Sequence, residues 1–205
     1  MSARDEILAR IRANRPAGQH DLPAVPDFTK PPPKGVQARF FDNLALMGGT
    51  VLAPDGSGDL LKPLRDRLAK TSRVCSAAPE IKGDVMLDSS VAPRALADVE
   101  VAVVRAAFAV AETGSILLTE AELGVNSLGY LAQHLVVLLD PADVVDSTQQ
   151  AYLRPEFHSA RYACLHSGPS ATADIEGVLI LGAQGVRSLT VVMVPRGNAP
   201  LGAAA

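Results

Sequence analysis

The sequence has few aromatic residues and few cysteines. Tryptophan is absent, and five Phe and three Tyr are the whole aromatic content of 205 residues. A core therefore has to be built from Ala, Val, Leu and Ile. The two cysteines, Cys75 and Cys164, lie in apolar segments far apart in the sequence, which is typical of buried thiols in a reducing compartment. Two thiols are too few for a four-cysteine zinc or iron–sulfur site within this chain.

Long apolar runs are also missing. Arg105 and Glu112 interrupt the richest stretch before it reaches the roughly 18 residues of a membrane span, and the N-terminus lacks the apolar segment of a signal peptide. We therefore expect no membrane span and a cytoplasmic protein.

Basic residues are scarce in the second half of the chain, and no lysine follows Lys82. Residues 106–205 carry 4 basic and 9 acidic side chains, whereas residues 1–105 carry 15 basic and 13 acidic ones. Nucleic-acid binding depends on clustered Lys and Arg that neutralise phosphates. The charge distribution therefore argues against a nucleic-acid partner.

Common nucleotide and hydrolase motifs are absent. No Gly-Lys-Ser, Gly-Lys-Thr or Gly-x-Ser-x-Gly occurs. Gly56 and Gly58 match the first two glycines of the dinucleotide fingerprint, but Leu61 stands in place of the third, and Asp55 and Asp59 would repel a pyrophosphate. A plain turn is expected at this point.

The chain begins with a predicted arm. Over residues 2–14, Ser2 and Asp5 form an approximate capping box ahead of apolar residues at helical spacing, which predicts a short amphipathic helix. Six prolines between residues 16 and 34 predict an extended connector. We therefore divide the chain into an arm at 1–34 and a domain at 35–205. Packing of the helix on its own domain is favoured over docking to a partner.

Helices and strands alternate in the predicted domain, which favours a layered α/β fold. A break at Thr113-Gly114-Ser115 predicts a tight hairpin, and Pro63 is expected in the first turn of its helix. Continuous apolar runs favour strands covered on both faces, as in parallel sheets. The predicted helices cover 37–49 and 59–70, the first strands cover 50–53 and 73–77, and the continuous runs cover 134–140, 161–167 and 189–195.

Residues 166–176 are the densest polar segment. They follow a predicted strand and precede a predicted short helix, so we expect them at the carboxyl edge of the sheet, where open α/β folds bind ligands. Gly168 would admit a ligand to the backbone, and Ser170 and Thr172 would bind its carboxylate or phosphate. The alternative, favoured by residue types alone, is that Thr172 caps the helix and Asp174 lies in its first turn.

Glu112 is the second candidate. It follows the apolar run 107–111, so partial burial is expected to raise its pKa towards the range of a base or nucleophile. Alternatively, its carboxylate caps a turn by accepting backbone amides. His134 precedes a predicted strand and His166 ends one, but no two histidines have the spacing of metal ligands. No metal site is expected.

Several segments resemble one family. AETGSILL, LAQHLVVLL and above all GPSATADIEGVLILGAQGVRSLTVVMV are similar to the lactate-utilisation protein C family, also called the LUD domain family, as is the opening DEILARIRANRP. The resemblance extends from residue 4 to about residue 196, with order and spacing preserved.

The resemblance implies a Rossmann-like α/β fold of the NagB/RpiA/CoA-transferase type, with flanking helices and a β-hairpin, and a part in the oxidation of L-lactate to pyruvate. It implies two iron–sulfur proteins as partners and no cofactor in this chain. No catalytic residue is established for the family. The Glu-Thr-Gly at Glu112 is also similar to the glutamate turn of CoA transferases, whose carboxylate forms a thioester intermediate.

This chain departs from the family at two places. Ala171 stands where the family commonly has Arg after the Gly-Pro-Ser, and Gln184-Gly185-Val186 stands where it has His-Gly-Pro. The missing Arg removes a bidentate carboxylate partner from the loop.

Three functions remain open: an accessory or ligand-binding subunit of lactate oxidation, an acyl-CoA transferase-like or sugar-phosphate enzyme using Glu112, and a sensor of small carboxylates. All three assume that the hairpin turn and the Gly-Pro-Ser turn meet over one hollow. The candidate residues are Glu112 as the catalytic residue and Thr113, Gly114, His134, Gly168, Ser170, Thr172 and Asp174 as ligand-binding residues.

Overall fold

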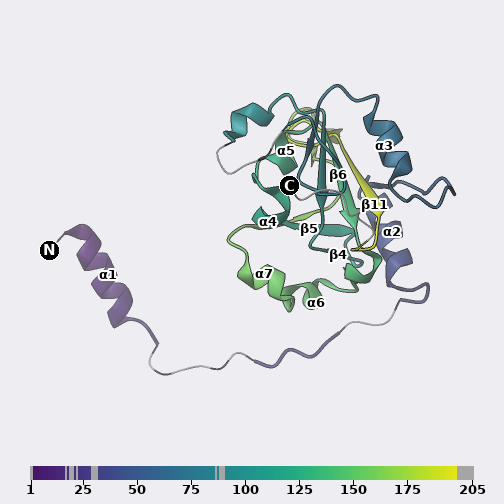
Figure 1. Ribbon diagram of the computed structural model, residues 1–205. Coiled ribbons are helices and arrows are strands. Elements are labelled where there is room, and N and C mark those ends of the chain that lie inside the picture. Colours follow the sequence, from purple (N-terminus) through teal and green to yellow (C-terminus); the bar gives the residue numbers. More distant parts are fainter. Residues whose placement is uncertain are drawn as a thin grey trace.

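The computed structural model describes residues 2–16, 18, 21, 23–28, 32–85, 87 and 91–197. Figure 1 shows a body of helices and strands with an N-terminal helix standing off to one side. Residues 17, 19, 20, 22 and 29–31 of the predicted connector lie outside the described residues, as do the last eight residues of the predicted domain.

The N-terminal helix α1 (Ala3–Ala13) confirms the predicted capping box. The Ser2 hydroxyl accepts from the Asp5 amide at 3.3 Å, and the Asp5 carboxylate accepts from the Ser2 amide at 3.0 Å. No residue of α1 is buried, and Figure 1 shows the helix apart from the body. The expectation that it packs on its own domain is therefore wrong. The apolar face of α1 is short, and its Ile7 and Ile11 are both more than half exposed.

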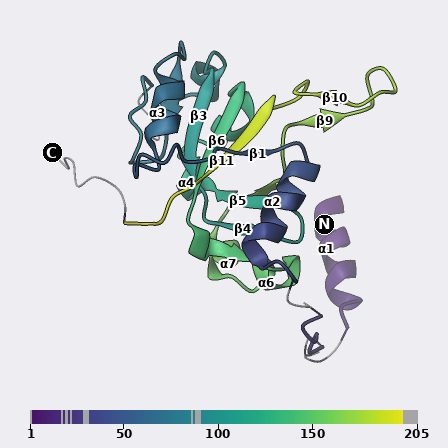
Figure 2. The same cartoon turned by 90° about the vertical axis from the view of Figure 1, so that its right-hand side faces the viewer.

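The central sheet has five strands in the order β1-β11-β6-β3-β2, and every neighbouring pair is parallel. This arrangement confirms the predicted α/β class with a parallel sheet. Figure 2 shows these strands side by side, with α3 over one face. The strand bounds are β1 (Thr50–Val51), β2 (Val74–Ser76), β3 (Val101–Arg105), β6 (His134–Leu139) and β11 (Ser188–Met193).

Both faces of this sheet are covered, which explains the unbroken apolar runs. Along β3, Ala102 and Val104 belong to one hydrophobic cluster, while Val101 and Val103 belong to another. Successive side chains of a strand point to opposite faces. A strand between two cores therefore needs an apolar residue at every position, because neither face meets water.

A second, mixed sheet of four strands adjoins the first, in the order β7-β4-β5-β8. Its strands are β4 (Phe108–Val110), β5 (Ser115–Thr119), β7 (Val144–Val145) and β8 (Ala163–His166). β4 and β5 are antiparallel and form the predicted hairpin. β8 is antiparallel to β5, so placing the run 161–167 in a parallel sheet was wrong. Its pairing partner is fixed by contacts distant in sequence.

Short helices surround the two sheets. α3 has Pro63 in its first turn, as predicted. Before it, the Asp55 and Asp59 carboxylates accept from the Ser57 and Leu61 amides at 2.9 and 3.1 Å, which makes residues 55–61 a local turn. Among the described residues, no helix has the length and apolar character needed to cross a bilayer. The helices are α2 (Val36–Leu46), α3 (Lys62–Leu68), α4 (Glu120–Leu123), α5 (Leu128–Leu131), α6 (Thr148–Tyr152) and α7 (Pro155–Ser159), with short 3-10 turns at Pro93–Leu96 and Pro141–Asp143.

A small hairpin leaves the body before β11. It consists of β9 (Ala171–Thr172) and β10 (Ile180–Leu181), which are antiparallel, and Figure 2 shows it projecting from the fold. The short helix predicted after Thr172 is therefore wrong. The Thr172 hydroxyl accepts from the Asp174 amide at 3.2 Å, so it caps a turn of the hairpin instead of a helix.

Candidate functional site

The β4–β5 turn is pressed against the helix α2. Gly114 has a φ of +65°, and a Cβ built there would lie 2.4 Å from the Leu44 backbone nitrogen. From α2, the Asn43 side-chain amide donates to the carbonyls of Ala111 and Glu112 at 2.8 and 3.0 Å. Glycine is required here because a side chain would collide with the α2 backbone. These contacts hold Glu112 beside α2.

The Glu112 carboxylate accepts from the backbone amide of Thr148, at the start of α6, at 2.8 Å. This hydrogen bond lowers the pKa of Glu112 from its ordinary value. Burial is the next largest effect and raises the pKa, while the Thr148 side chain and the charge of Arg39 lower it further. The expectation of a raised pKa is therefore wrong. The turn lies at the surface, and a backbone amide stabilises the charged form more than desolvation penalises it.

A second acidic group beside the turn is neutralised by α2. Arg39 donates through Nη1 to the Asp146 carboxylate at 2.6 Å, and the Asp146 side chain is 8% exposed while that of Arg39 is 31% exposed. Among the described residues, the Arg39 guanidinium group makes no further hydrogen bond or ion pair. The rest of its guanidinium group therefore has donors to offer to a ligand.

A pocket of about 950 Å³ opens between α2, the connector and the start of α6. The connector is held there by Gln149, whose side-chain amide donates to the Pro26 carbonyl at 2.9 Å and accepts from the Phe28 amide at 3.4 Å. The lining combines apolar connector residues with charged and amide side chains, as in many ligand sites. The lining residues are Phe28, Pro32, Pro33, Lys34, Arg39, Asp42, Asn43, Glu112, Ser147 and Gln149.

The Gly-Pro-Ser turn packs on Met47, the residue that follows the end of α2. Gly168 has a φ of +83°, and a Cβ there would lie 2.0 Å from the Met47 carbonyl oxygen. The two turns meet through a hydrogen bond between the hydroxyls of Ser115 and Ser167. The structure therefore brings Thr113 and Gly114 close to Gly168. Gly168 itself does not line the pocket. Of the predicted site residues, Glu112 is the one that does.

Ser170, Thr172 and Asp174 lie elsewhere. The Ser170 amide donates to the Val186 carbonyl at 2.9 Å, two residues before β11 begins. The segment is thus at the amino edge of the parallel sheet, and its expected place at the carboxyl edge is wrong. The reason is topological, because the loop after β8 has to return to the start of β11. Thr172 and Asp174 project with the β9–β10 hairpin (Figure 2).

His134 begins β6 and is also at the amino edge. Its Nδ1 lies 2.8 Å from the Ser188 hydroxyl on the neighbouring strand β11. It is not among the residues that line the pocket. The predicted common hollow over the two turns therefore does not include His134, Ser170, Thr172 or Asp174.

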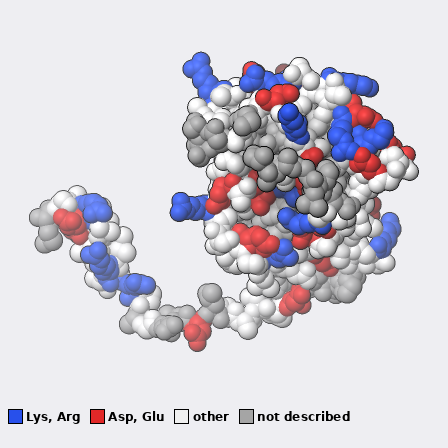
Figure 3. All heavy atoms as spheres, viewed as in Figure 1, with Lys and Arg blue, Asp and Glu red and all other residues white. Residues whose placement is uncertain are grey.

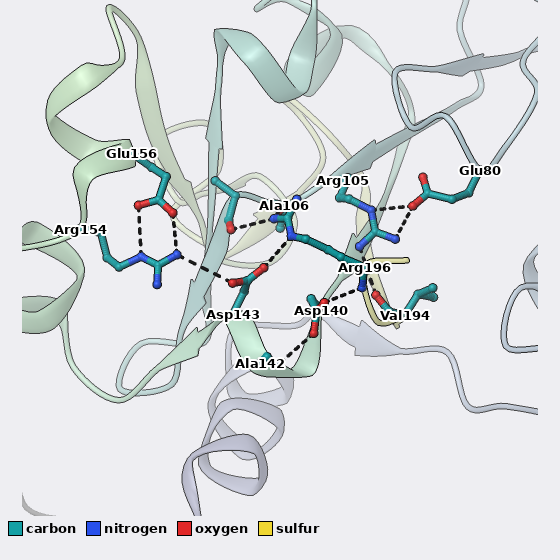
Figure 4. Close-up of polar contacts among 11 residues, drawn as sticks. Glu80, Arg105, Ala106, Asp140, Ala142, Asp143, Arg154, Glu156, Val194 and Arg196 are labelled. Atoms are coloured by element: carbon teal, nitrogen blue, oxygen red, sulfur yellow. Dashed lines mark hydrogen bonds and ion pairs between the residues drawn. The ribbon is translucent and has the colours of Figure 1, made fainter. Parts of the chain in front are cut away.

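The carboxyl edge of the parallel sheet is filled with the protein's own charges (Figure 4). Arg105, at the end of β3, pairs with Glu80 and donates to the Val194 carbonyl at 3.1 Å. Arg196 donates to Asp143 at 2.8 Å and to the Ala106 carbonyl at 2.9 Å. These contacts join the ends of β3, β6 and β11. The edge at which open α/β sheets usually bind ligands is therefore occupied here by contacts that hold the strand ends together.

The described cysteines lie apart in the fold. Cys75 is in β2 and is buried, which raises the pKa of its thiol, whereas Cys164 is in β8 of the other sheet. Within the part of the chain that the structure describes, no three His, Cys, Asp or Glu side chains gather in an arrangement suited to a metal ion.

Of the ten lining residues, the sequence predicted only Glu112 as a site residue, and the nine that it did not indicate include Lys34, Arg39, Asn43 and Gln149. Arg39 and Asn43 are four positions apart, which places both on one face of the predicted helix 37–49. That spacing could have drawn attention to them. No sequence pattern indicated Gln149, because its role is to hydrogen-bond to the connector, more than 120 residues earlier in the chain.

The fold defines a class: an α/β domain in which a five-stranded parallel sheet adjoins a smaller mixed sheet, with a pocket where α2 meets the β4–β5 turn. A family model described as the LUD domain matches residues 62–194, more than half of the chain, and the protein belongs to this family. The family is associated with lactate utilisation.

A solved structure supports the same fold. The chain is similar to a crystal structure of a DUF162 family protein from Deinococcus radiodurans, with a TM-score of 0.58 and 17% sequence identity. The similarity covers 78% of this chain and 96% of that one. At this identity the likeness shows the fold alone. No curated protein matches the sequence.

Proposed function

We propose that this protein takes part in the oxidation of L-lactate to pyruvate as an accessory or ligand-binding subunit that acts with iron–sulfur partner proteins. The observation that carries the proposal is the LUD domain match over residues 62–194. The chain has only two cysteines. An iron–sulfur cluster that accepts electrons from lactate would therefore have its thiolate ligands on other chains.

The pocket beside α2 is the proposed ligand site. Lys34 and Arg39 offer hydrogen-bond donors along its lining, and an Arg guanidinium can bind a carboxylate through two parallel bonds. The charge of Glu112 is partly satisfied by the Thr148 amide, which reduces its repulsion of an anionic ligand. Together these groups favour a small carboxylate such as lactate or pyruvate.

The pathway is tested in the source organism by deleting the gene and measuring growth on lactate. We expect growth on lactate to fail while growth on glucose continues, and tagged protein to co-purify with iron–sulfur proteins. Normal growth on lactate together with the absence of such partners would contradict the proposal. Complementation with the variant Glu112→Gln should restore growth, because an accessory subunit does not need this carboxylate as a nucleophile.

The ligand is tested by thermal unfolding with lactate, pyruvate and, as a control anion, chloride. A ligand at 100 times its dissociation constant stabilises the folded state by about 2.7 kcal/mol. We expect lactate or pyruvate to raise Tm in the native protein and not in Arg39→Gln. An equal rise in both proteins would place the ligand outside this pocket.

Acyl transfer through Glu112 is a second candidate, favoured by the lowered pKa of this group and its position in the pocket. The ionised carboxylate would attack the thioester carbonyl of an acyl-CoA and release the CoA thiolate. That thiolate would then attack the Glu112 carbonyl, giving a glutamyl thioester and a free carboxylate. Hydroxylamine added with acyl-CoA should then modify the Glu112 peptide. An unmodified peptide in mass spectrometry rules this candidate out.

A further inference from the structure

Two exposed apolar surfaces of this chain have complementary charge. One is the face of α1, where Ile7 and Ile11 are 59% and 62% exposed. The other is the β9–β10 hairpin, which we call the projecting hairpin (residues 171–181). Its Ile175, Val178, Leu179 and Leu181 are all more than half exposed. Contiguous exposed apolar side chains of this kind commonly mark an interaction surface.

Neither surface has the contacts that would stabilise it alone. An isolated helix of 11 residues is marginal in water. The projecting hairpin has two residues in each strand, and a two-stranded hairpin is also marginal without packing on another element. It is anchored at its base, where the Ser170 carbonyl accepts from the Gly182 amide at 2.7 Å. At its tip, the Ala173 carbonyl accepts from the Gly177 amide at 3.0 Å, a contact within the hairpin itself, while the apolar side chains of the tip stay exposed, which favours a partner across both surfaces.

The acidic groups of the arm are engaged within the arm. Asp5 accepts from Ser2, and Glu6 pairs with Arg10 at 3.0 Å. Arg4 and Arg12 make no ion pair among the described residues. Arg4 lies three positions before Ile7, and Arg12 lies four positions after Leu8. Positions three and four apart are neighbours on a helix, so both arginines border the apolar face. Figure 3 shows basic side chains on this arm.

The projecting hairpin carries the opposite charge. Asp174 and Glu176 are exposed at its tip, on either side of Ile175. In the described part of the chain neither carboxylate has an ion-pair partner. An apolar helix face bordered by arginines therefore matches an apolar hairpin bordered by carboxylates.

We propose that the arm of one protomer docks on the projecting hairpin of a second copy of this chain, so that the two copies exchange arms in a symmetric dimer. Figure 1 shows the arm directed away from its own body. The connector of residues 16–34 provides the reach, since an extended chain spans up to about 3.3 Å per residue. A reciprocal exchange makes the same small contact twice, and such self-complementary pairing is the usual geometry of dimers.

The first test measures mass against concentration by light scattering on the full-length protein. We expect a concentration-dependent dimer. Ile11→Asp in the arm and Leu179→Asp in the projecting hairpin should each weaken dimerisation about 100-fold or more, as loss of a central apolar contact does. Leu153→Asp is the matched control, because Leu153 is 77% exposed on the body. A monomer at every concentration, or a dimer that resists both substitutions, overturns the proposal.

Charge reversal tests the electrostatic match. The double variant Asp174→Arg with Glu176→Arg should weaken the dimer about tenfold, and so should Arg4→Glu with Arg12→Glu. Mixing these two proteins should restore a dimer, because the basic arm of the first meets the acidic hairpin of the second and the acidic arm of the second meets the basic hairpin of the first. The four-fold variant should restore both contacts. If the four-fold variant is as weak as either double variant, the proposed pairing is wrong.

A cross-link distinguishes exchange from docking within one chain. A chain with Ile11→Cys is mixed with a chain with Leu179→Cys, both in the background Cys164→Ser, and oxidised with copper phenanthroline. Exchange predicts a disulfide-linked pair of different chains. A chain carrying both substitutions that forms only an internal disulfide, at every concentration, contradicts the exchange.

Discussion

The carboxyl edge of the parallel sheet and the pocket beside α2 both gather charged side chains, and they use them differently. At the edge, Arg105 and Glu80 are 11% and 5% exposed, and their charges are met by each other and by a backbone carbonyl. At the pocket, Arg39 is 31% exposed and is bonded through one nitrogen. The edge holds strands together, whereas the remaining donors of Arg39 are open to the ligand that we propose for the pocket. A topological edge alone is therefore a poor guide to the site in this fold.

The largest effect is expected at the edge. Arg105→Met leaves the Glu80 carboxylate buried without its partner, and breaking such a pair typically costs about 3–5 kcal/mol of unfolding free energy. Urea unfolding monitored by circular dichroism measures it. The double variant Arg105→Met with Glu80→Gln is the control and should recover much of the loss, because the unpaired charge is gone. A loss below about 1 kcal/mol in the single variant would show that the Arg105–Glu80 pair contributes no more to stability than a partly exposed pair, which would contradict the comparison.

The next effect is expected at the turn that holds the pocket. Gly114→Ala places a Cβ against the α2 backbone at a φ of +65°, and we expect a loss of about 2–4 kcal/mol in urea unfolding. Gly56→Ala is the matched control, because Gly56 has a φ of +80° and nothing within 4 Å. It should lose about 1 kcal/mol from strain alone. Equal losses would mean that the contact with α2 adds nothing.

A smaller effect is expected at the pocket ion pair. Arg39→Ala removes a charged hydrogen bond from the buried Asp146, which costs about 1.5–3 kcal/mol in comparable cases. Because Arg39 is partly exposed and water can replace it, the loss should lie near the lower limit and well below that of Arg105→Met. Thermal unfolding measures both variants side by side. A larger loss at Arg39 than at Arg105 would reverse the comparison.

The smallest effect is the pH dependence of Glu112. Its pKa is lower in the folded protein than its ordinary value of 4.5. Its contribution to stability is therefore present above that value and is lost as the pH falls through the folded pKa. Glu112→Gln should reduce the unfolding free energy by less than about 1 kcal/mol at pH 7, with the difference vanishing at acidic pH.

The matched control for this measurement is Asp42→Asn. Asp42 is an acid of the same pocket and forms a long, exposed pair with Lys34 at 3.7 Å. It should change little at any pH, because exposed pairs contribute little. A difference at Glu112 that grows as the pH falls has the wrong sign for a lowered pKa and would contradict the role of the Thr148 amide.

Local patterns predicted the fold well where their causes are local. The capping box at Ser2 and Asp5, Pro63 in the first turn of α3 and the hairpin break before Ser115 all depend on neighbours in sequence. The buried strands β6 and β11 were predicted from unbroken apolar runs, since both faces meet cores. The family was predicted from the similarity of short sequence segments, which are also local features, and the family model confirms it.

The failures have distant causes. Glu112 takes its hydrogen bond from Thr148, 36 positions later, so its pKa could not follow from the apolar residues before it. The strand order sends the segment after Ser167 to the amino edge of the sheet, and only the long-range pairing of β8 with β5 reveals this. The pocket exists because Gln149 holds the connector, a contact that no periodicity encodes.

The connector wall of the pocket has a consequence for divergence within the family. Seven of the ten lining residues, from Phe28 to Asn43, precede the region 62–194 that defines family membership. Relatives could therefore retain the strands from β2 to β11 while acquiring different upstream segments, and the chemistry of the pocket would change while most of the scaffold stayed the same. Ligand preference in such proteins would then vary independently of the domain by which the family is recognised.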